Sequence, residues 1–199
     1  MKVVGLDLAG SEKRNTGFCL LDERLRCETR VLFSDEQIVA ETKGASPDLV
    51  SIDAPLFLPK GRKSLEQRGP PHLRACDREL LRMKIRFFPL SLGPMRMLTA
   101  RGMSLRSVFE GDGLTVIEGY PGAVQDVLSI PRKQEGVEKL RQGLIEFGVK
   151  GDIEKGGISA DELDSICCAL VGKMFLEDDY VAIGVEEEGF MILPRPRPR

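Results

Sequence analysis

The sequence predicts an α/β fold built on a single mixed sheet, and three observations lead to that prediction. Short apolar runs separated by short polar turns follow one another over the first 33 residues, which is typical of antiparallel strands. A later apolar run at residues 49–53 follows a helical pattern, which favours a strand parallel to a neighbour in the sheet. Three of the runs end in an acid: Asp7, Asp53 and Glu118.

The first three strands are expected at residues 2–8, 16–21 and 27–33, joined by hairpin turns. Alternation along the first strand places Asp7 on the same face as Gly5. An ionised carboxylate in a buried strand is costly unless charge or hydrogen bonds satisfy it. Asp7 therefore either caps the following turn or belongs to a metal or phosphate site.

A helix is predicted between the third and fourth strands. Ser34 and Gln37 have the spacing of a capping box, and Gly44 and Pro47 end the helical pattern. The fourth strand follows at residues 49–53, and because a helix leads to it, we expect it to run parallel to a neighbour in the sheet.

Charge is unevenly distributed along the chain. From Lys60 to Arg106, twelve Lys and Arg stand against three Asp and Glu, a net charge of +9. Because the whole chain carries −2, the remaining residues carry −11. We interpret residues 60–110 as a basic insertion between the fourth and fifth strands that faces an anionic substrate. Abundant Arg and Glu are also typical of growth at high temperature, which is the alternative explanation.

One helix is predicted within this insertion, at about residues 73–86. Arg74, Arg78 and Arg82 recur there every four residues and form one basic stripe, which is either a phosphate-binding surface or an ordinary solvated face. The candidate substrate-binding residues are Lys60, Arg62, Arg74, Arg78 and Arg82.

In the C-terminal half, the pattern of apolar residues predicts a fifth strand at 114–118, a helix at 134–147 and a closing hairpin within 180–193. Between them, Ser159 and Glu162 have capping-box spacing and begin the most apolar helix of the chain. We expect one domain over residues 1–193, followed by a flexible Pro-Arg tail at 194–199.

Composition excludes several classes of protein. No apolar run approaches the roughly 18 residues of a membrane span, and the N-terminal residues have the pattern of a strand rather than a signal peptide. Five cysteines without a CxxC pair predict reduced, buried thiols in a cytoplasmic protein rather than a disulfide or zinc framework. The single histidine, His72, disfavours histidine-based catalysis.

Acids are placed so that they could form one cluster. Parallel strands would bring the acids at their ends to one edge of the sheet, and the last helix adds two more, three residues apart. Such a cluster stays ionised only with cations, and hard oxygen ligands favour one or two Mg²⁺ or Mn²⁺ ions. The candidate catalytic and metal-binding residues are Asp7, Asp53, Glu118, Asp161 and Asp164.

Five segments resemble the RNase H-like superfamily, and in particular its domain-of-unknown-function 429 family of predicted nucleases. They are, in order, Gly5-Leu6-Asp7-Leu8-Ala9, Ile52-Asp53-Ala54-Pro55-Leu56, Arg74-x-Cys76-Asp77-Arg78-x-Leu80, Glu118-Gly-Tyr-Pro121 and Asp161-Glu-Leu-Asp164-x-x-x-Cys168-Ala-Leu. The resemblance implies a five-stranded mixed sheet flanked by helices, with strands 1–3 antiparallel and strands 4 and 5 parallel to strand 1. It also implies two-metal hydrolysis of DNA or RNA, with Asp7 as the bridging ligand.

Two other functions stay open. An actin-like or sugar-kinase-like ATP-binding protein would use residues 7–11 as a phosphate loop, although such folds need two halves and this chain has room for one. A non-catalytic module would bind nucleic acid through its basic segment alone. The sequence leaves open whether Asp53 or Glu118 is the second metal ligand, and what the oligomeric state is.

Overall fold

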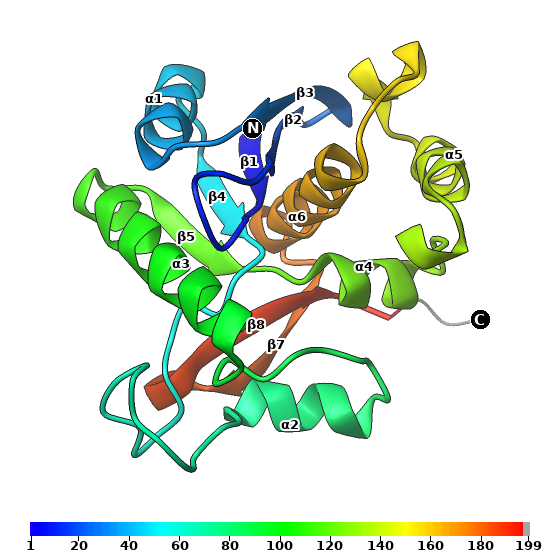
Figure 1. Cartoon of the computed structure of the whole chain (residues 1–199). Coiled ribbons are helices and arrows are strands. Elements are labelled where there is room, and N and C mark those ends of the chain that lie inside the picture. The colour runs from blue at the N-terminus through cyan, green and yellow to red at the C-terminus, as the bar shows by residue number, and fades with distance from the viewer. Residues whose placement is uncertain (197–199) are drawn as a thin grey trace.

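The structure is a computed structural model that describes residues 1–196 (Figure 1). Its strands are β1 (Lys2–Asp7), β2 (Thr16–Asp22), β3 (Arg26–Leu32), β4 (Leu49–Ile52), β5 (Thr115–Glu118), β6 (Lys150–Gly151), β7 (Tyr180–Val185) and β8 (Gly189–Pro194). Its α-helices are α1 (Asp35–Ala45), α2 (Ala75–Arg82), α3 (Gly93–Gly111), α4 (Pro121–Leu128), α5 (Val137–Phe147) and α6 (Ala160–Leu176). Short 3-10 segments are η1 (Lys133–Glu135), η2 (Asp152–Lys155) and η3 (Glu186–Glu188).

The strands of the described residues form one sheet in the order β6-β3-β2-β1-β4-β5-β8-β7. The predicted core is confirmed, because β1, β2 and β3 pair antiparallel while β4 and β5 continue parallel to β1. The prediction of five strands is wrong, since the sheet has eight. The closing hairpin β7–β8 extends it beyond β5, where Glu118 pairs with Met191, and the two-residue β6 extends the opposite edge beside β3.

Residues 60–110 are only partly an insertion. Helix α3 is the crossover between β4 and β5, and its buried Leu105 and Phe109 belong to the core on one face of the sheet. This helix was not predicted, because Gly93 and Pro94 are residues that commonly interrupt helices. In the structure, Pro94 lies in the first turn of α3, where the missing N–H costs no hydrogen bond. The predicted helix at 73–86 is present but shorter, as α2.

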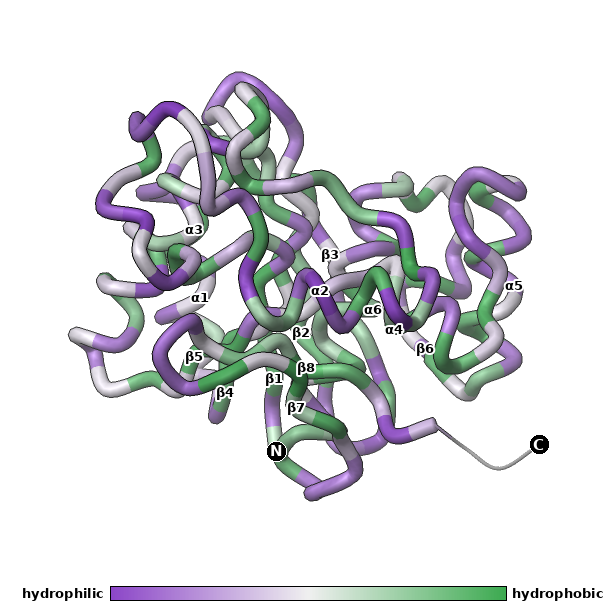
Figure 2. Tube along the Cα trace, turned by 90° about the horizontal axis from the view of Figure 1, so that it is seen from below, coloured by the Kyte–Doolittle hydropathy of each residue, from purple (hydrophilic) through white to green (hydrophobic). Residues whose placement is uncertain are grey.

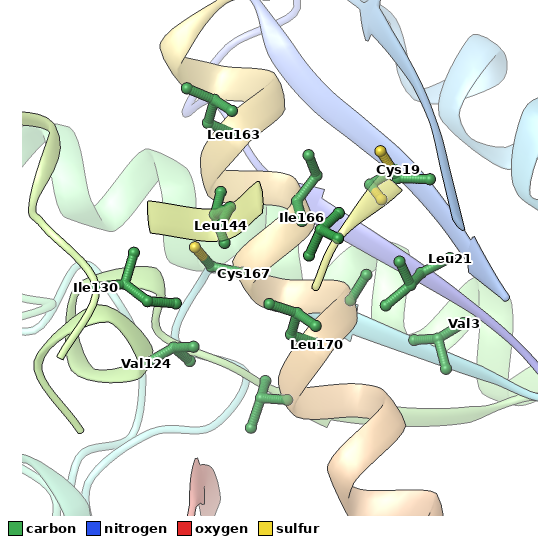
Figure 3. Packing of buried hydrophobic residues seen from close by; sticks show 14 of the residues in the cluster. Val3, Cys19, Leu21, Val124, Ile130, Leu144, Leu163, Ile166, Cys167 and Leu170 are labelled. Carbon is green, nitrogen blue, oxygen red and sulfur yellow. The ribbon is translucent and has the colours of Figure 1, made fainter. Parts of the chain in front are cut away.

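Two apolar cores cover the two faces of the sheet. On one face, α6, α4 and α5 pack on alternate residues of β1, β2 and β4 (Figure 3). On the other face, α1 and α3 pack on the intervening residues. Hydrophilic segments lie mostly at the periphery, and much of α5 is among them (Figure 2). The predicted alternation is confirmed, so Asp7 shares with Val3 and Gly5 the face that α6 covers.

Helix α6 lies unusually close to β1 and β2 because glycines face it. A Cβ on Gly5 would lie 2.2 Å from the carbonyl oxygen of Ser165, and one on Gly17 would lie 2.0 Å from that of Asp161. The predicted capping box is confirmed, since Ser159 accepts the Glu162 N–H and begins the helix. Together these features bring the first turns of α6 over the end of β1.

Three further expectations concern the cysteines, the membrane and the tail. All five cysteines are buried and unbridged. Among the described residues, no helix has the length and apolar character needed to cross a membrane. The expected tail boundary falls inside β8, because Pro194 pairs with Tyr180, and Arg195 forms an ion pair with Asp179. Residues 197–199 of the expected tail lie outside the described residues.

Candidate functional site

Asp7 and Asp53 lie side by side at the carboxyl edge of two neighbouring parallel strands. Leu6 and Ile52 are partners in the β1–β4 register, and the Asp53 N–H donates to the Leu6 carbonyl at 2.8 Å. Each Asp is the next residue along its strand, so the two carboxyl groups lie close together at this edge, and the charge of Asp7 raises the pKa of Asp53.

Asp164 brings a third carboxylate to this edge from α6. It is 4% exposed and fully engaged by two side chains. One oxygen accepts from the Gln125 amide of α4 at 2.7 Å, and the other accepts from the Lys133 ammonium of η1 at 2.6 Å. We call Asp7, Asp53, Asp164 and Lys133 the open cluster, because one cation faces three carboxyl groups.

Charge is incompletely balanced in the open cluster. Burial, followed by the Asp164 carboxylate, raises the pKa of Asp7 from 3.8 to about 7, although Lys133 opposes this. Burial and the neighbouring Asp7 raise the pKa of Asp53 well above its usual range. Burial lowers the pKa of Lys133, but Asp164 outweighs it and raises that pKa above the ordinary value. Near neutral pH the cluster therefore retains protons that a cation could replace.

Asp161 lies in the first turn of α6, at the margin of the open cluster. Its carboxylate contributes to the raised pKa of Asp7, and it lines the same cavity as Asp7 and Lys133. Of the five predicted acids, Asp7, Asp53 and Asp164 thus lie together, and Asp161 lies at their rim.

Glu118 belongs to a different group, which we call the closed cluster: Arg74, Asp77 and Glu118. Arg74 donates to both Glu118 oxygens, at 2.6 and 2.7 Å, and to Asp77 at 3.0 Å. Glu118 also accepts the Leu56 N–H at 2.9 Å. All three charged side chains are nearly fully buried, so the Glu118 carboxylate is committed to Arg74 rather than directed at the open cluster.

Two predicted phosphate-binding residues, Arg62 and Arg74, are buried and bind other parts of the chain, so we leave them out of the proposed phosphate-binding set. The Arg74 side chain is 2% exposed and holds the closed cluster together. The Arg62 guanidinium donates to four backbone carbonyls of the segment that follows it, those of Leu65, Gln67, Gly69 and Pro71. The predicted stripe on α2 fails at Arg74 because that residue precedes the helix and turns inward.

The other three candidates are exposed. The side chains of Lys60, Arg78 and Arg82 are 70%, 51% and 70% exposed and form ion pairs at the surface. Lys60 and Arg78 pair with acids of η3, and Arg82 pairs with Glu79 of its own helix. These pairs are weak in solvent, so the three cations can exchange partners.

Two cavities meet at the open cluster. One, of about 720 Å³, extends along residues 7–11 and includes Asp7, Asp161 and Lys133. The other, of about 240 Å³, includes Asp53, Asp164 and again Lys133. Met95 and Leu98 of α3 also border both cavities. The carboxyl groups are therefore reachable from two sides.

The donor chemistry of the open cluster fits a hard divalent cation. It offers carboxylate oxygens alone, and their mutual repulsion disfavours full ionisation without added positive charge. Within residues 1–196, no group of three acidic, histidine or cysteine side chains is arranged so that it could hold a metal ion. The Lys133 ammonium occupies one Asp164 oxygen.

Sequence reasoning missed three residues that shape this region. Lys133 and Gln125 hold Asp164, and neither stands in a recognisable motif. Arg101 of α3 is 7% exposed and donates to the carbonyls of Ala9 and Phe33, which fixes the turn after β1. Arg101 lies in the basic segment, where surface residues are expected, and the sequence did not show that α3 packs against the sheet.

Comparison with known proteins defines the class of the fold. No family model matches the sequence, and no curated protein matches it. The sheet and its flanking helices share their fold with a solved structure that the match covers almost in full.

One such structure is Thermus thermophilus RuvC in complex with a Holliday junction substrate. It has a TM-score of 0.52 and 13% identity, and the match covers 96% of this chain and 99% of that one. A second T. thermophilus RuvC structure has a TM-score of 0.49 and 14% identity, over 89% and 97% of the two chains.

Proposed function

We propose that this protein is a metal-dependent nuclease that hydrolyses phosphodiester bonds of DNA or RNA at the open cluster. The observation that carries the proposal is the convergence of Asp7, Asp53 and Asp164 at one edge of an RNase H-like sheet, with too little positive charge to balance them. A buried group with a strongly raised pKa beside a cavity is typical of a functional site.

Asp7, Asp53 and Asp164 would hold one or two Mg²⁺ or Mn²⁺ ions. Asp7 is the best candidate for a shared ligand, because it interacts with Asp53, Asp164 and Asp161. Bound cations would activate a water molecule and neutralise charge on the leaving oxygen. Lys133 would have to release Asp164 for that oxygen to become a ligand, and Gln125 would keep the carboxylate oriented. Glu118 is left out of the proposed ligand set.

Nucleic acid is the proposed partner. The structural neighbour of TM-score 0.52 is described in complex with a Holliday junction substrate. In this chain Lys60, Arg78 and Arg82 are the exposed cations proposed to contact phosphate groups. Membership of the domain-of-unknown-function 429 family and a cytoplasmic location stay proposals that rest on sequence motifs and on the cysteines.

A cleavage assay tests the function. Purified protein is incubated with Mg²⁺ or Mn²⁺ and with single-stranded, duplex and four-way-junction DNA and RNA. We expect cleavage of at least one substrate, lost on chelation and reduced by about 100-fold or more in Asp7→Asn. Asp178→Asn is the matched control, because Asp178 lies outside the site at φ 58°, a conformation that Asn tolerates.

Other outcomes would favour the alternatives. Nucleic-acid binding without cleavage in either ion would contradict the enzyme and support a binding module. ATP binding would support the actin-like alternative. That alternative is disfavoured by the turn after β1, because the Ala9 N–H already donates to Thr16 and the Ala9 carbonyl accepts from Arg101.

A further inference from the structure

The smaller cavity beside the open cluster has an aromatic lining that the proposed hydrolysis does not use. Phe87 and Phe88 come from the loop between α2 and α3, and Tyr120 precedes α4. Met95 and Leu98 of α3 close another side. Asp53, Asp164 and Lys133 also line it, so the cavity is continuous with the proposed catalytic site, and the charged side chains of Arg74, Asp77, Glu118 and Arg132 line it as well.

The loop that carries the two phenylalanines is anchored by buried Ile85 before them and buried Leu90 after them, but Phe88 itself is exposed. Phe87 packs against the buried cluster that includes Leu80 and Met191. The Tyr120 hydroxyl donates to the carbonyl of Arg86, which ties the loop to the start of α4. Phe88, the next residue, is 71% exposed and still lines the cavity. A large aromatic ring so exposed at the mouth of a cavity is available to stack on a ligand.

The size and chemistry of the cavity indicate its occupant. Its volume of about 240 Å³ lies below the range of about 300–1,000 Å³ for sites of drug-sized ligands, and suits one planar ring system. The amide of Gln134 lines it and can meet the polar edge of such a ring. Aromatic and apolar side chains beside polar ones match a nucleobase, whose faces stack and whose edge forms hydrogen bonds.

We propose that this cavity receives one unstacked nucleobase of the strand whose phosphate lies at the open cluster, with Phe88 as its stacking platform. This inference rests on the proposed nuclease function and narrows its substrate class. A base inside a regular duplex cannot enter such a cavity without being extruded. The preferred substrate is therefore a single strand, or a branched or distorted duplex with an unpaired base beside the cleaved bond.

The test uses oligonucleotides that each carry one 2-aminopurine, moved stepwise along a single strand, and the Asp7→Asn protein, which is not expected to cut them. Fluorescence anisotropy measures binding, and 2-aminopurine emission measures the environment of the base. We expect bound 2-aminopurine to change its emission at one or two positions only. Adding Phe88→Ala should abolish that change and weaken single-strand binding about 5- to 100-fold, as for loss of one base–aromatic stack.

Matched controls separate stacking from folding and from charge. Leu81→Ala removes an apolar side chain that is 54% exposed on α2 and does not line the cavity, so binding should be unchanged. A fully paired duplex should bind equally well to the Asp7→Asn protein with and without the Phe88→Ala change. Binding with no emission change at any position, or with no effect of Phe88→Ala, would overturn the base site and leave the nuclease proposal standing. Absence of any nucleic-acid binding would overturn both.

Discussion

Two groups of buried acids lie next to each other at the carboxyl edge of the sheet, and their charges are compensated differently. In the closed cluster, Arg74 donates to Glu118 with both ends of its guanidinium and also reaches Asp77. In the open cluster, Lys133 forms its ion pair with Asp164, and burial raises the pKa of both Asp7 and Asp53. The closed cluster satisfies its hydrogen bonds internally, whereas the open cluster retains a capacity for added cations. Incomplete compensation, rather than the mere presence of acids, distinguishes a candidate site from a structural ion pair.

Removing the cation of the closed cluster should have the largest effect. Arg74→Met would leave Glu118 and Asp77 buried without their partner, and we expect it to lower the free energy of unfolding by about 3–5 kcal/mol. Urea denaturation measures the loss. Arg78→Met, within α2 and half-exposed, is the control and should cost less than about 1 kcal/mol. Equal losses in the two variants would show that the closed cluster is not a structural unit.

Replacing an acid of the open cluster with a neutral residue should raise the free energy of unfolding near neutral pH, whereas Arg74→Met lowers it. The pKa of Asp7 is raised from 3.8 to about 7, so the folded protein holds a proton that the unfolded chain releases. Stability in chelator should therefore fall as pH rises from about 4 to 7, by up to about 4 kcal/mol for Asp7, and Asp53 should add to the fall. Asp7→Asn should lessen this decline and be more stable than wild type at pH 8. A variant less stable than wild type at pH 8 would contradict the account.

Replacing the single cation of the open cluster should strengthen metal binding. Lys133→Met frees one Asp164 oxygen and removes a positive charge that competes with Mg²⁺. The affinity for Mg²⁺ should therefore rise about tenfold, which corresponds to less free energy than the full interaction of two neighbouring unit charges. The concentration of Mg²⁺ needed to raise the melting temperature measures this effect. Lys139→Met, on the exposed face of α5, should leave it unchanged. Weaker binding in Lys133→Met would mean that the lysine assists the metal instead of competing with it.

The smallest effect should come from an exposed cation that belongs to neither cluster. Arg82→Ala removes a 70% exposed side chain whose partner is Glu79, so stability should change by less than about 0.5 kcal/mol. If Arg82 contacts a phosphate group, the slope of log affinity against log salt should fall by about one. An unchanged slope would remove Arg82 from the proposed nucleic-acid surface.

Much of the central sheet could be predicted from local pattern. The hairpins at residues 2–33 and the capping boxes at Ser34 and Ser159 depend on neighbouring residues, and the structure confirms them. The attachment of β8 to β5 was not predictable, because it joins segments far apart in sequence with no shared pattern. Helix α3 was missed because a proline at a helix start resembles a proline that breaks a helix.

Contacts between distant segments also decide the roles of the acids, and local sequence patterns do not predict those contacts. Asp53 and Glu118 both follow apolar strand residues, so the sequence makes them equivalent. What separates them is Arg74, which lies 44 residues before Glu118 and reaches it only in the folded chain. Lys133 of η1 likewise meets Asp164 of α6 only in the folded chain. Strand ends can thus be predicted locally, but the charge that each acid meets cannot.

A calorimetric titration with Mg²⁺ at pH 8 tests the central distinction most directly. Wild type and the remote control Asp178→Asn should bind Mg²⁺ saturably, and Asp53→Asn should bind it about 10- to 100-fold more weakly or not at all. The affinity for wild type should also fall as pH drops below about 7, because protons compete for Asp7. Binding to Asp53→Asn as tight as to wild type would contradict the assignment of the open cluster as the metal site.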